Sequence, residues 1–545
     1  MTTCKQCNRP YEITSEDEDF YKKFNARDLG RCFECSQKNR LALRNARCLY
    51  HRKCDATGED TISMYSPDKP YKVYKSDYWY GDAWDAMNYG QDFDFSRSFF
   101  GQLKELQLKV PRLALSNINA VNSDYCNSSY GNKNCYLIFG GDNNEDCMFG
   151  TLCMKNTRSL DLDFSNFNEL SYMLADCFKC YNTQFAVDSK NCTDSAFLSD
   201  CTSCSDCILC TNLVNKSYCI LNKQYSKEEY FLKKAELLNG TYSQQKQLFD
   251  SFKNLLSERV VKYAHTVSCQ GCSGDYIKNS KNCTMCFNVT DSEDLRNIIF
   301  ANKSKDCFNS SMLGENSELA YETVSAYHAY NVQFSFFVID SSNIEYCDLA
   351  INSKDLFGCV GVRNKQYCIF NKQYSKEDFE SLRAKIVEHM KKTGEWGEFF
   401  PKTFSCFAYN ETTAQVYQAM TKEAALAEGY TWKDEGLKEV HIPSSGIPDK
   451  IEEVSDSILK EVLLCEGCQK NYRIISQELA FYRTQRLPIP HLCSECRQGV
   501  RKDLLNPRRL WARLCEACGI ALQSSYSPDR PEKVYCEACY LKTVY

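Results

Sequence analysis

The sequence lacks the apolar stretches that mark membrane-spanning and secreted chains. A helix that spans a bilayer needs about 18 or more consecutive apolar residues, and the 545-residue sequence contains no such run. The residues that follow Met1 are polar, whereas a signal peptide carries an apolar core at that place. We therefore expect a cytoplasmic protein without membrane contact.

Histidine is scarce, and the common catalytic motifs are missing. The chain has six histidines and no HExxH, GxSxG or P-loop sequence. Two acid pairs, Asp161 with Asp163 and Asp92 with Asp94, have the spacing that places both carboxylates on one face of a strand. Such pairs more often belong to solvated turns than to active sites. We predict that the protein is not an enzyme and keep a solenoid-based carbohydrate-active enzyme as an alternative.

A strong charge of either sign is also absent. Lysine and arginine number 66 against 71 aspartates and glutamates, which gives a net charge of −5 and a pI of about 5.9. A chain with this balance is not a polycation. Any binding of nucleic acid must therefore come from local basic patches rather than from the molecule as a whole.

Cysteine, by contrast, is abundant, with 35 residues. Each end of the chain carries two CxxC pairs separated by 24 residues, and the C-terminal end adds two more pairs separated by 17. Four thiolates from two such pairs satisfy the tetrahedral preference of zinc. Disulfides are the alternative, but they are rare in a reducing cytosol. We predict three Zn²⁺ sites, with the ligands Cys4, Cys7, Cys32 and Cys35; Cys465, Cys468, Cys493 and Cys496; and Cys515, Cys518, Cys536 and Cys539.

The two ends of the chain are copies of one module of roughly 75–80 residues. The match extends beyond the cysteines, because Tyr21 aligns with Tyr482 and Arg40 aligns with Arg501. A YSPD sequence follows in both copies. We therefore expect the two modules to have the same fold.

The N-terminal copy retains only one residue of the third cysteine set, Cys54. The places of the other three ligands are taken by Thr57, Lys75 and Tyr78. We expect hydrophobic residues to hold this part of the module together without metal. A weaker alternative is a separate site formed by Cys48, His51 and Cys54.

The stretch between the modules repeats on two scales. On the longer scale, NKSYCILNKQY at 215–225 returns as NKQYCIFNKQY at 364–374, 149 residues later. On the shorter scale, segments such as NCYLIF, SLDLDF and NTQFAV recur every 10–13 residues. If each segment is a half-turn, one circuit takes about 22–24 residues, which is typical of a parallel β-solenoid. We predict one central solenoid with helical insertions, with a β-sandwich as the alternative.

Cysteine is small and apolar enough to line the inside of such a solenoid. Two further sets have spacings that permit metal, but we interpret them mainly as packing residues: Cys269, Cys272, Cys283 and Cys286, and Cys201, Cys204, Cys207 and Cys210. The recurring cysteines that we expect to be buried, reduced and metal-free are Cys135, Cys147, Cys192, Cys219, Cys283 and Cys368.

Helices are predicted at the ends of the repeat blocks and beside them. Ser226 and Ser375 each begin an S-x-x-E/D capping box. Apolar residues recur with helical spacing over Phe99–Val110, and Glu377–Lys392 continues from the second capping box. A short helix is expected over Thr421–Gly429, where the glycine ends it.

The predicted fold is multidomain and mainly β, with treble-clef or zinc-ribbon modules that flank the parallel β-solenoid. The predicted segments are a treble-clef zinc module at 1–80, a connector at 81–118, β-solenoid repeat block 1 at 119–224, a helical insertion at 225–262, β-solenoid repeat block 2 at 263–374, a helix and aromatic cap at 375–440, a linker at 441–460 and a double zinc module at 461–545.

These motifs resemble two groups of known proteins. CKQCNRPYEITSEDEDFYKKFN…RCFEC resembles the treble-clef "probable zinc-ribbon" family, in which a second CxxC opens a basic helix. Over most of the chain, YSPDKPYKVY at 65–74, NCYLIF at 134–139 and NKQYSKEEY at 222–230 resemble large uncharacterised bacterial zinc-ribbon proteins with a Cys-rich, solenoid-like centre. The treble-clef resemblance implies that the first two groups of four cysteines named above bind zinc. It implies no activity.

A basic segment follows the second CxxC pair of each terminal module. Residues 36–53 contain six cations and no acid, and residues 497–513 contain six cations and one acid. An arginine-rich helix held by zinc is a common way to contact phosphates. We predict a non-enzymatic protein that binds RNA or DNA in this way, with an alternative role as a protein-interaction or structural scaffold. The predicted phosphate-binding residues are Lys38, Arg40, Arg44, Arg47, Arg52, Arg497, Arg501, Lys502, Arg508, Arg509 and Arg513.

Overall fold

The computed structural model describes residues 1–434, 436, 440–441 and 446–544. These residues form two compact units, each built from separate stretches of the chain. Unit 1 comprises residues 1–115, 264–434 and 508–510, and unit 2 comprises residues 116–263, 435–507 and 511–545. The N-terminal module therefore shares a unit with the second repeat block, and most of the C-terminal module shares a unit with the first.

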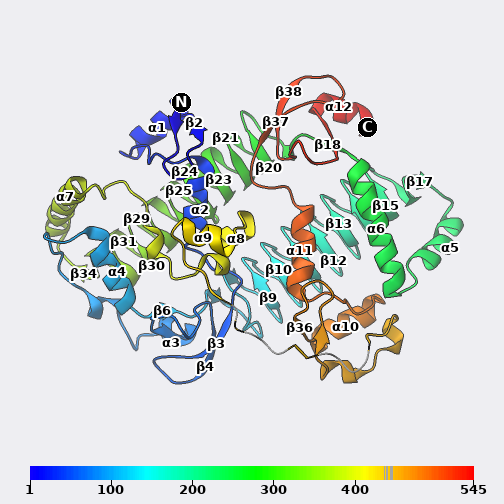
Figure 1. The fold of residues 1–545 in the computed structure, drawn as a ribbon, viewed down its shortest axis with the longest axis horizontal. Coiled ribbons are helices and arrows are strands. Elements are labelled where there is room, and N and C mark those ends of the chain that lie inside the picture. The colour runs from blue at the N-terminus through cyan, green and yellow to red at the C-terminus, as the bar shows by residue number, and fades with distance from the viewer. Residues whose placement is uncertain (435, 437–439, 442–445, 545) are drawn as a thin grey trace. The chain divides into compact units, whose positions relative to one another are not determined.

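Unit 2 is built on a nine-stranded sheet, named ladder 1 (Figure 1). From β9 to β16 each strand pairs in parallel with the next at an offset of twelve residues, as Leu160 does with Tyr172. The last strand, β17, is antiparallel. The strands are β9 (Tyr136–Phe139), β10 (Met148–Thr151), β11 (Leu160–Asp163), β12 (Tyr172–Ala175), β13 (Gln184–Val187), β14 (Ala196–Ser199), β15 (Ser205–Thr211), β16 (Ser217–Ile220) and β17 (Lys223–Gln224).

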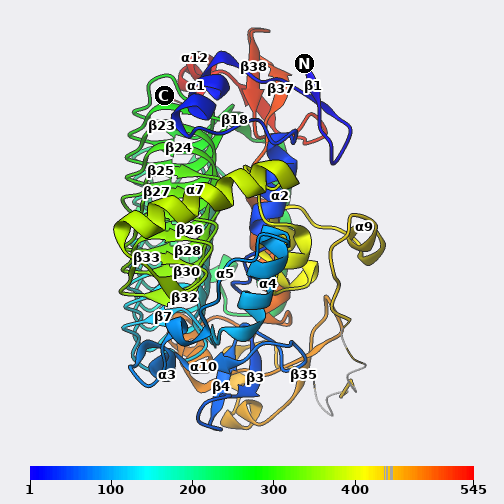
Figure 2. The same cartoon turned by 90° about the vertical axis from the view of Figure 1, so that its left-hand side faces the viewer.

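Unit 1 is built on a sixteen-stranded sheet, named ladder 2, whose strands stack regularly in Figure 2. The offset is again twelve residues, except for thirteen where Lys305 pairs with Glu318 and eleven where Thr266 pairs with Ile277. The strands are β19 (Thr266–Val267), β20 (Gly274–Lys278), β21 (Lys281–Thr284), β22 (Cys286–Thr290), β23 (Glu293–Asn302), β24 (Lys305–Leu313), β25 (Glu318–Tyr321), β26 (Val324–Tyr327), β27 (Tyr330–Gln333), β28 (Phe336–Ile339), β29 (Ser342–Glu345), β30 (Asp348–Ile351), β31 (Lys354–Phe357), β32 (Val360–Arg363), β33 (Gln366–Ile369) and β34 (Lys372–Gln373).

A three-residue rhythm in the backbone produces the twelve-residue offset. Asn134, Leu137, Gly140 and Asn143 have φ angles of 51°, 53°, 68° and 54°, and the pattern continues along both ladders. Each positive φ bends the chain, so four bends in twelve residues bring it back beside its starting point. Asparagine and aspartate tolerate this conformation better than most residues, which explains their abundance here. The predicted circuit of 22–24 residues is therefore wrong, because the 10–13-residue segment is a whole circuit.

The residue after a bend lies inside the ladder, and it is small or aliphatic: Asn132 and Cys135 are examples of the first kind, Ile138 and Leu162 of the second. Four interior asparagines, Asn132, Asn144, Asn156 and Asn168, stack at twelve-residue intervals. Each Nδ2 donates to the Oδ1 of the preceding asparagine at 3.0 Å. Backbone N–H groups donate to the same oxygens. The polar interior is thus hydrogen-bonded along its length, as buried amides require.

Cysteines occupy many of these interior positions. The burial predicted for six of them is confirmed, since Cys135, Cys147, Cys192, Cys219, Cys283 and Cys368 are all buried. The set from Cys201 to Cys210 also lies inside ladder 1, and Cys283 and Cys286 lie inside ladder 2. Their thiols donate to backbone carbonyls, as Cys201 Sγ does to Cys210 O at 3.5 Å. The packing interpretation of both sets therefore agrees with their placement.

The mainly β prediction is confirmed, but one part of it needs correction. The prediction that both repeat blocks form one solenoid, interrupted by a helical insertion, is wrong, because the two ladders are separate sheets that share no strand. The helices of residues 226–262 lie between them in sequence. The predicted segments 375–440 and 441–460 include residues 435, 437–439 and 442–445, which lie outside the described part of the chain.

The predicted helices are present with their caps. Ser226 and Glu229 form a complete capping box at the start of α5 (Lys227–Leu237). Ser375 caps α7 (Lys376–Thr393), and its side chain accepts from the backbone of Asp378. In the described part of the chain, no helix combines the length and the apolar character needed to cross a membrane.

The remaining elements of unit 1 are β1 (Thr2–Thr3), β2 (Pro10–Tyr11), α1 (Ser15–Lys23), α2 (Phe33–Leu41), β3 (Tyr50–Lys53), β4 (Asp60–Ser63), β5 (Val73–Tyr74), α3 (Ser76–Tyr80), α4 (Phe99–Lys109), β6 (Arg112–Leu113), α8 (Thr413–Tyr417) and α9 (Lys422–Ala427), with short 3₁₀ turns at Ala86–Tyr89, Lys402–Phe404 and Tyr409–Glu411. Those of unit 2 are β7 (Asn117–Ile118), β8 (Ser129–Tyr130), α6 (Tyr242–Glu258), β18 (Val260–Lys262), β35 (Leu463–Leu464), β36 (Asn471–Tyr472), α10 (Ser476–Gln485), α11 (Ser494–Leu504), β37 (Trp511–Leu514), β38 (Ala521–Ser524), β39 (Lys533–Tyr535) and α12 (Glu537–Val544), with 3₁₀ turns at Ile451–Glu453 and Asp456–Leu459.

The narrow interior predicts the effect of adding a single methyl group. A Cβ on Gly150 would lie 2.5 Å from Cys153 Sγ and 2.8 Å from Ile138 Cδ1. We expect Gly150→Ala to lower the free energy of unfolding by about 1–3 kcal/mol, measured by urea denaturation. The control is Gly499→Ala in α11, where a Cβ meets nothing within 4 Å; it should raise stability by about 0.5–1 kcal/mol. Equal stability of the two variants would contradict this account of the interior.

Candidate metal centres

Three groups of four cysteine sulfurs gather in the structure. Within each group all four Sγ atoms lie within 4.8 Å of one another. The three groups that can hold metal ions are Cys4, Cys7, Cys32 and Cys35; Cys465, Cys468, Cys493 and Cys496; and Cys515, Cys518, Cys536 and Cys539. These are the twelve predicted ligands, so the prediction of three metal-binding groups is confirmed.

The first CxxC pair of each group sits on a tight turn. The residue four positions after the first cysteine has a positive φ, and its N–H donates to the carbonyl of that cysteine. The N···O distances are 2.9 Å for Asn8, 3.0 Å for Gln469 and 2.8 Å for Gly519. Such a turn aims both thiols of the pair at one point, where a metal ion can sit.

The second CxxC pair opens a helix. Cys32 and Cys493 are the N-cap residues of α2 and α11, so the two thiols of each pair lie on the first turn. The backbone N–H of Cys493 donates to Cys465 Sγ at 3.2 Å. A hydrogen bond from the thiol of Cys35 lowers the pKa of Cys32 to about 6. Such hydrogen bonds favour the thiolate of the cysteine that accepts them, and the thiolate is the form that binds metal.

The incomplete third set of the N-terminal module keeps the same backbone arrangement. Gly58 N–H donates to Cys54 O at 2.8 Å, and Lys75 N–H donates to Cys54 Sγ at 3.3 Å. The ammonium of Lys75, which replaces a cysteine of the other copy, pairs with Glu59. An ion pair therefore accompanies the hydrophobic packing that was predicted to act alone. In the described part of the chain, the residues at 48, 51 and 54 form no metal-binding group.

In unit 2, two predicted phosphate-binding arginines of α11 are buried against ladder 1. Arg497 Nε lies 2.8 Å from Asp161 Oδ2, and its Nη2 lies 3.1 Å from Glu478 Oε1. Arg501 lies 2.6 Å from Asp161 and 2.7 Å from Asp163. All five side chains are at most 4% exposed. Helix α11 is thus joined to ladder 1 by a buried network of charges.

Unit 1 contains the corresponding contact. Arg40, on α2, lies 2.9 Å from Glu322 of ladder 2, and both side chains are buried. Its Nε also donates to Ser311 Oγ at 3.4 Å. In a second ion pair the charges are reversed: the ladder supplies the cation, Arg296, and the module supplies the acid, Asp17 of α1. Burial raises the pKa of Glu322, and the charge of Arg40 opposes that effect.

Aromatic contacts repeat the same interface in both units. In unit 2 the rings of Tyr482 and Tyr172 meet edge to face, with centroids 5.9 Å apart and an angle of 78°. In unit 1 the aligned residues Tyr21 and Tyr321 meet at 6.4 Å and 83°. Each terminal module therefore packs on a ladder in the same way. Nothing in the sequence shows that each module takes the ladder farther from it along the chain.

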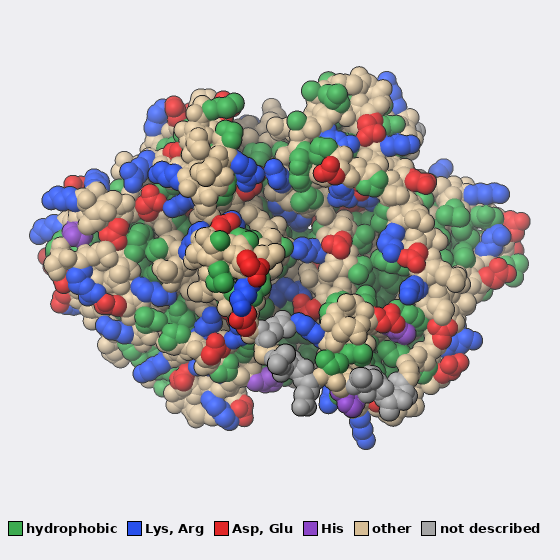
Figure 3. Space-filling model, in the orientation of Figure 1, with side chains coloured by type: hydrophobic (Ala, Val, Ile, Leu, Met, Phe, Trp, Pro, Cys, Tyr) green, Lys and Arg blue, Asp and Glu red, His purple; other side chains and the backbone are tan. Residues whose placement is uncertain are grey.

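Most of the other predicted phosphate-binding residues also have partners within their own unit. The ion pairs and hydrogen bonds are Lys38 with Glu428 (2.6 Å), Arg52 with Asp55 (2.8 Å), Arg508 with Asn288 (3.0 Å), Arg509 with Glu34 (3.7 Å) and Arg513 with Glu516 (3.0 Å). Arg44, Arg47 and Lys502 are half-buried. On the face shown in Figure 3, basic and acidic side chains are interspersed.

Two predictions about individual residues need correction. Arg40, Arg497 and Arg501 do not face solvent, because their guanidinium groups satisfy buried carboxylates. The pair Asp161 and Asp163, considered as a sign of a carbohydrate-active enzyme, supplies those carboxylates in unit 2. The two aspartates of β11 could therefore have indicated that a basic helix packs on this strand. Their partner Arg497, however, lies more than 300 residues away along the chain.

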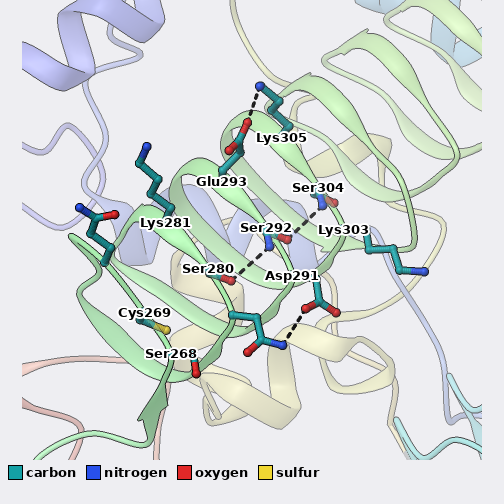
Figure 4. A pocket seen from close by; sticks show the side chains of 12 residues that line it. Ser268, Cys269, Ser280, Lys281, Asp291, Ser292, Glu293, Lys303, Ser304 and Lys305 are labelled. Carbon is teal, nitrogen blue, oxygen red and sulfur yellow. Dashed lines mark hydrogen bonds and ion pairs between the residues drawn. The ribbon is translucent and has the colours of Figure 1, made fainter.

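A polar groove of about 730 Å³ lies on ladder 2 and crosses four neighbouring circuits (Figure 4). Inside it, Ser280, Ser292 and Ser304 form a column linked by backbone-to-hydroxyl hydrogen bonds. On its surface, Glu293 pairs with Lys305. Lys303 pairs with Glu315, which lies outside the groove lining, and Asp291 accepts a hydrogen bond from Asn279 at 2.9 Å.

Comparison with known proteins assigns no family. No protein-family model matches the chain, and no curated protein is similar to it. Among solved structures, a candidate acetyltransferase from Desulfovibrio desulfuricans G20 shares 9% identity over 48% of this chain and 69% of its own, with a TM-score of 0.10. UDP-N-acetylglucosamine acyltransferase from Campylobacter jejuni shares 12% identity over 55% of this chain and 97% of its own, also with a TM-score of 0.10. Likenesses this low say nothing about fold or activity.

The three cysteine groups predict the metal content of the purified protein. We expect elemental analysis after exhaustive dialysis to find three metal ions per chain. Replacing Cys515 and Cys518 with serine should reduce the count to two, since two thiolates alone hold a metal weakly. Cys54→Ser is the control and should leave the count at three. A wild-type count of one or fewer would contradict the assignment.

The buried charges predict that replacing two different arginines of the C-terminal module changes the stability of the protein by very different amounts. Arg501→Ala leaves the buried carboxylate of Asp163 without its partner and leaves Asp161 with Arg497 alone, and we expect it to lower the free energy of unfolding by about 3–5 kcal/mol. Arg509→Ala removes an exposed charge and should change it by less than about 1 kcal/mol. Urea denaturation measures both. The metal content of Arg501→Ala should stay at three, which separates loss of docking from loss of a metal site.

Proposed function

We propose that the protein is a zinc-dependent, non-enzymatic scaffold of the cytoplasm that binds partner proteins along its repeats. In this proposal each ladder is a β-solenoid with twelve-residue circuits, and the metal modules hold helices against the solenoids. The observation that carries it is the burial of Arg40, Arg497 and Arg501 in ion pairs with ladder carboxylates. Helices whose arginines point inward hold the terminal modules on the ladders and do not present a phosphate-binding surface.

The sulfur geometry supports zinc as the metal. Four sulfurs at about 2.3 Å from a tetrahedral zinc ion lie about 3.8 Å from one another. The distances are 3.7 Å between Cys7 and Cys32, 3.7 Å between Cys468 and Cys493, and 3.8 Å between Cys518 and Cys536. When bound, zinc would supply no reaction step here. All four ligands are cysteines, the donor set of structural rather than catalytic zinc sites.

Exposed aromatic side chains on β8 and on ladder 1 favour a partner protein. Tyr130, Phe167 and Tyr181 are 47%, 43% and 44% exposed, although all three are large and partly apolar. Phe167 meets Phe178 edge to face at 5.3 Å, and the ammonium of Lys155 lies 5.3 Å from the Phe167 ring. Aromatic residues are enriched in the centres of protein–protein interfaces. A rigid ladder can present such rings without a cost in conformational entropy.

The partner experiment compares two variants that leave the fold intact. The tagged chain is crosslinked and purified from the cells in which it naturally occurs. Wild type and Tyr330→Ser, which changes an exposed aromatic residue of ladder 2, should capture the same protein after nuclease treatment. The double variant Phe167→Ser/Tyr181→Ser should lose it, because two of the three exposed rings are removed. Capture that persists in the double variant, or that nuclease abolishes, would refute the proposal.

The earlier hypothesis of nucleic-acid binding has its own test. Because its central arginines are paired inside the units, we expect mixed-sequence RNA and DNA to show no mobility shift with about 1 μM protein at low salt. Binding through phosphates would appear as a shift that weakens steeply with added salt. Such a result would restore nucleic acid as the partner and would place the contact on cations other than Arg40, Arg497 and Arg501.

A further inference from the structure

The two ladders end in the same hairpin. In ladder 1 the strand β16 pairs with β17, and in ladder 2 the strand β33 pairs with β34, both antiparallel and in the same register. The two residues of each turn have positive φ angles, 51° and 60° in ladder 1 and 46° and 57° in ladder 2. The two turns differ in sequence at one place, where Leu221 aligns with Phe370. What covers the two ends can therefore be compared residue by residue.

In unit 1 a short segment, residues 90–93 with the sequence GQDF, covers the hairpin. The backbone N–H of Gln91 donates to the carbonyl of Phe370 at 3.0 Å. Gly90 lies directly on the turn, because a Cβ at this position would lie 2.3 Å from the carbonyl oxygen of Asn371. The close approach of the two backbones therefore requires glycine at this place.

The next two residues of the segment contact the hairpin through their side chains. The carboxylate of Asp92 lies 2.6 Å from the ammonium of Lys372. The ring of Phe93 meets that of Phe370, with centroids 5.6 Å apart and an angle of 59°. Phe370 and Asn371 are completely buried in this arrangement. Residues 90–93 thus contribute, in order, a close backbone approach, a backbone donor, a carboxylate and a ring.

The hairpin of unit 2 has the corresponding groups exposed. Leu221 is 60% exposed, and Asn222 and Lys223 are exposed as well. Among the described residues, no N–H group donates to the carbonyl of Leu221. No carboxylate of those residues pairs with Lys223 either, and its ammonium lies 5.5 Å from the ring of Tyr225. A backbone acceptor, a cation and an apolar side chain therefore lie together at the surface of this end of ladder 1.

We propose that this end of ladder 1 binds a partner protein through a segment with the sequence Gly-x-Asp-Phe. The glycine of the partner lies on the turn, and the N–H that follows it donates to the carbonyl of Leu221. The aspartate pairs with Lys223, and the phenylalanine covers Leu221. These are the contacts that residues 90–93 make in unit 1.

The contacts of unit 1 also indicate where the segment comes from. Residues 90–93 of the chain are held by the hairpin of ladder 2, and the same is true of a second copy. A different protein is therefore the expected source. The site does not depend on the exposed rings of the scaffold proposal, because it uses neither Phe167 nor Tyr181.

The binding experiment uses a dye-labelled peptide with the sequence of residues 88–97, NYGQDFDFSR, and the metal-loaded full chain. Fluorescence anisotropy should show one site per chain with a Kd below about 1 mM. A peptide with the change Gly90→Val should not bind, because its side chain would overlap the turn. The double variant Phe167→Ser/Tyr181→Ser should bind the first peptide as wild type does, which separates this site from that of the scaffold proposal.

Two variants of Leu221 test the apolar contact in opposite directions. Leu221→Phe installs the residue of unit 1, where Phe370 has a similar φ, and should tighten binding about threefold or more, since two rings then meet. Leu221→Asn keeps a residue that tolerates a φ of 51° and should weaken binding about tenfold. A gain in affinity cannot result from poor folding, so the first variant guards the interpretation of the second.

A charge exchange tests the ion pair. Lys223→Glu should weaken the peptide about fivefold or more, because two acids then face each other. A peptide with the change Asp92→Lys should bind this variant more tightly than it binds wild type. The control is Val121→Ser, which changes another exposed residue of unit 2 and should leave the affinity unchanged.

Four results would contradict the proposal. The first is no anisotropy change up to about 1 mM protein, and the second is equal binding of the Gly90→Val peptide. The third is an unchanged affinity in both Leu221→Asn and Lys223→Glu, which would place the peptide elsewhere on the chain. The fourth is self-association of the chain that Leu221→Asn abolishes, which would identify a second copy as the occupant instead of a different protein.

Discussion

The width of the twelve-residue circuit governs the rest of this structure. Four bends in twelve residues leave room inside for one side chain per bend, and these places are taken by cysteine, serine, alanine and asparagine and by aliphatic residues such as Leu162 and Leu174. This interior is too narrow for an aromatic ring. The large apolar residues of the strands, among them Phe185, Phe197 and Tyr321, therefore point outward. A ladder of this kind is stable only when other elements cover its outer faces.

The metal modules supply part of that cover in both units. A group of four thiolates fixes the start of α2 or α11, and the arginines that follow reach carboxylates on the ladder. A buried ion pair adds less stability than an apolar contact of equal size, but it penalises any wrong register, because a displaced arginine would leave a charge unpaired. We suggest that Arg40 and Arg501 select the docking position while the aromatic contacts of Tyr21 and Tyr482 contribute the hydrophobic stabilisation.

Whether a feature could be predicted from the sequence depended on how far apart the interacting residues lie along the chain. The CxxC pairs, the capping boxes of Ser226 and Ser375 and the buried cysteines follow local patterns, and all were predictable. The circuit length was misjudged, since a spacing of 10–13 residues fits a half-turn as well as a full turn when the bends are unknown. The partner of Arg501 was missed because Asp163 lies 338 residues away and its own neighbours suggested a different role.

The sequence by itself determined where metal can bind, where helices begin and which side chains are small enough to be enclosed. These properties depend on residues that are neighbours along the chain or repeat at a constant interval. Only the tertiary structure decided that the N-terminal module packs on the second ladder and that the basic helices face inward. Burial and charge pairing depend on what lies opposite in space, and duplicated segments offer more than one equivalent partner until the chain has folded.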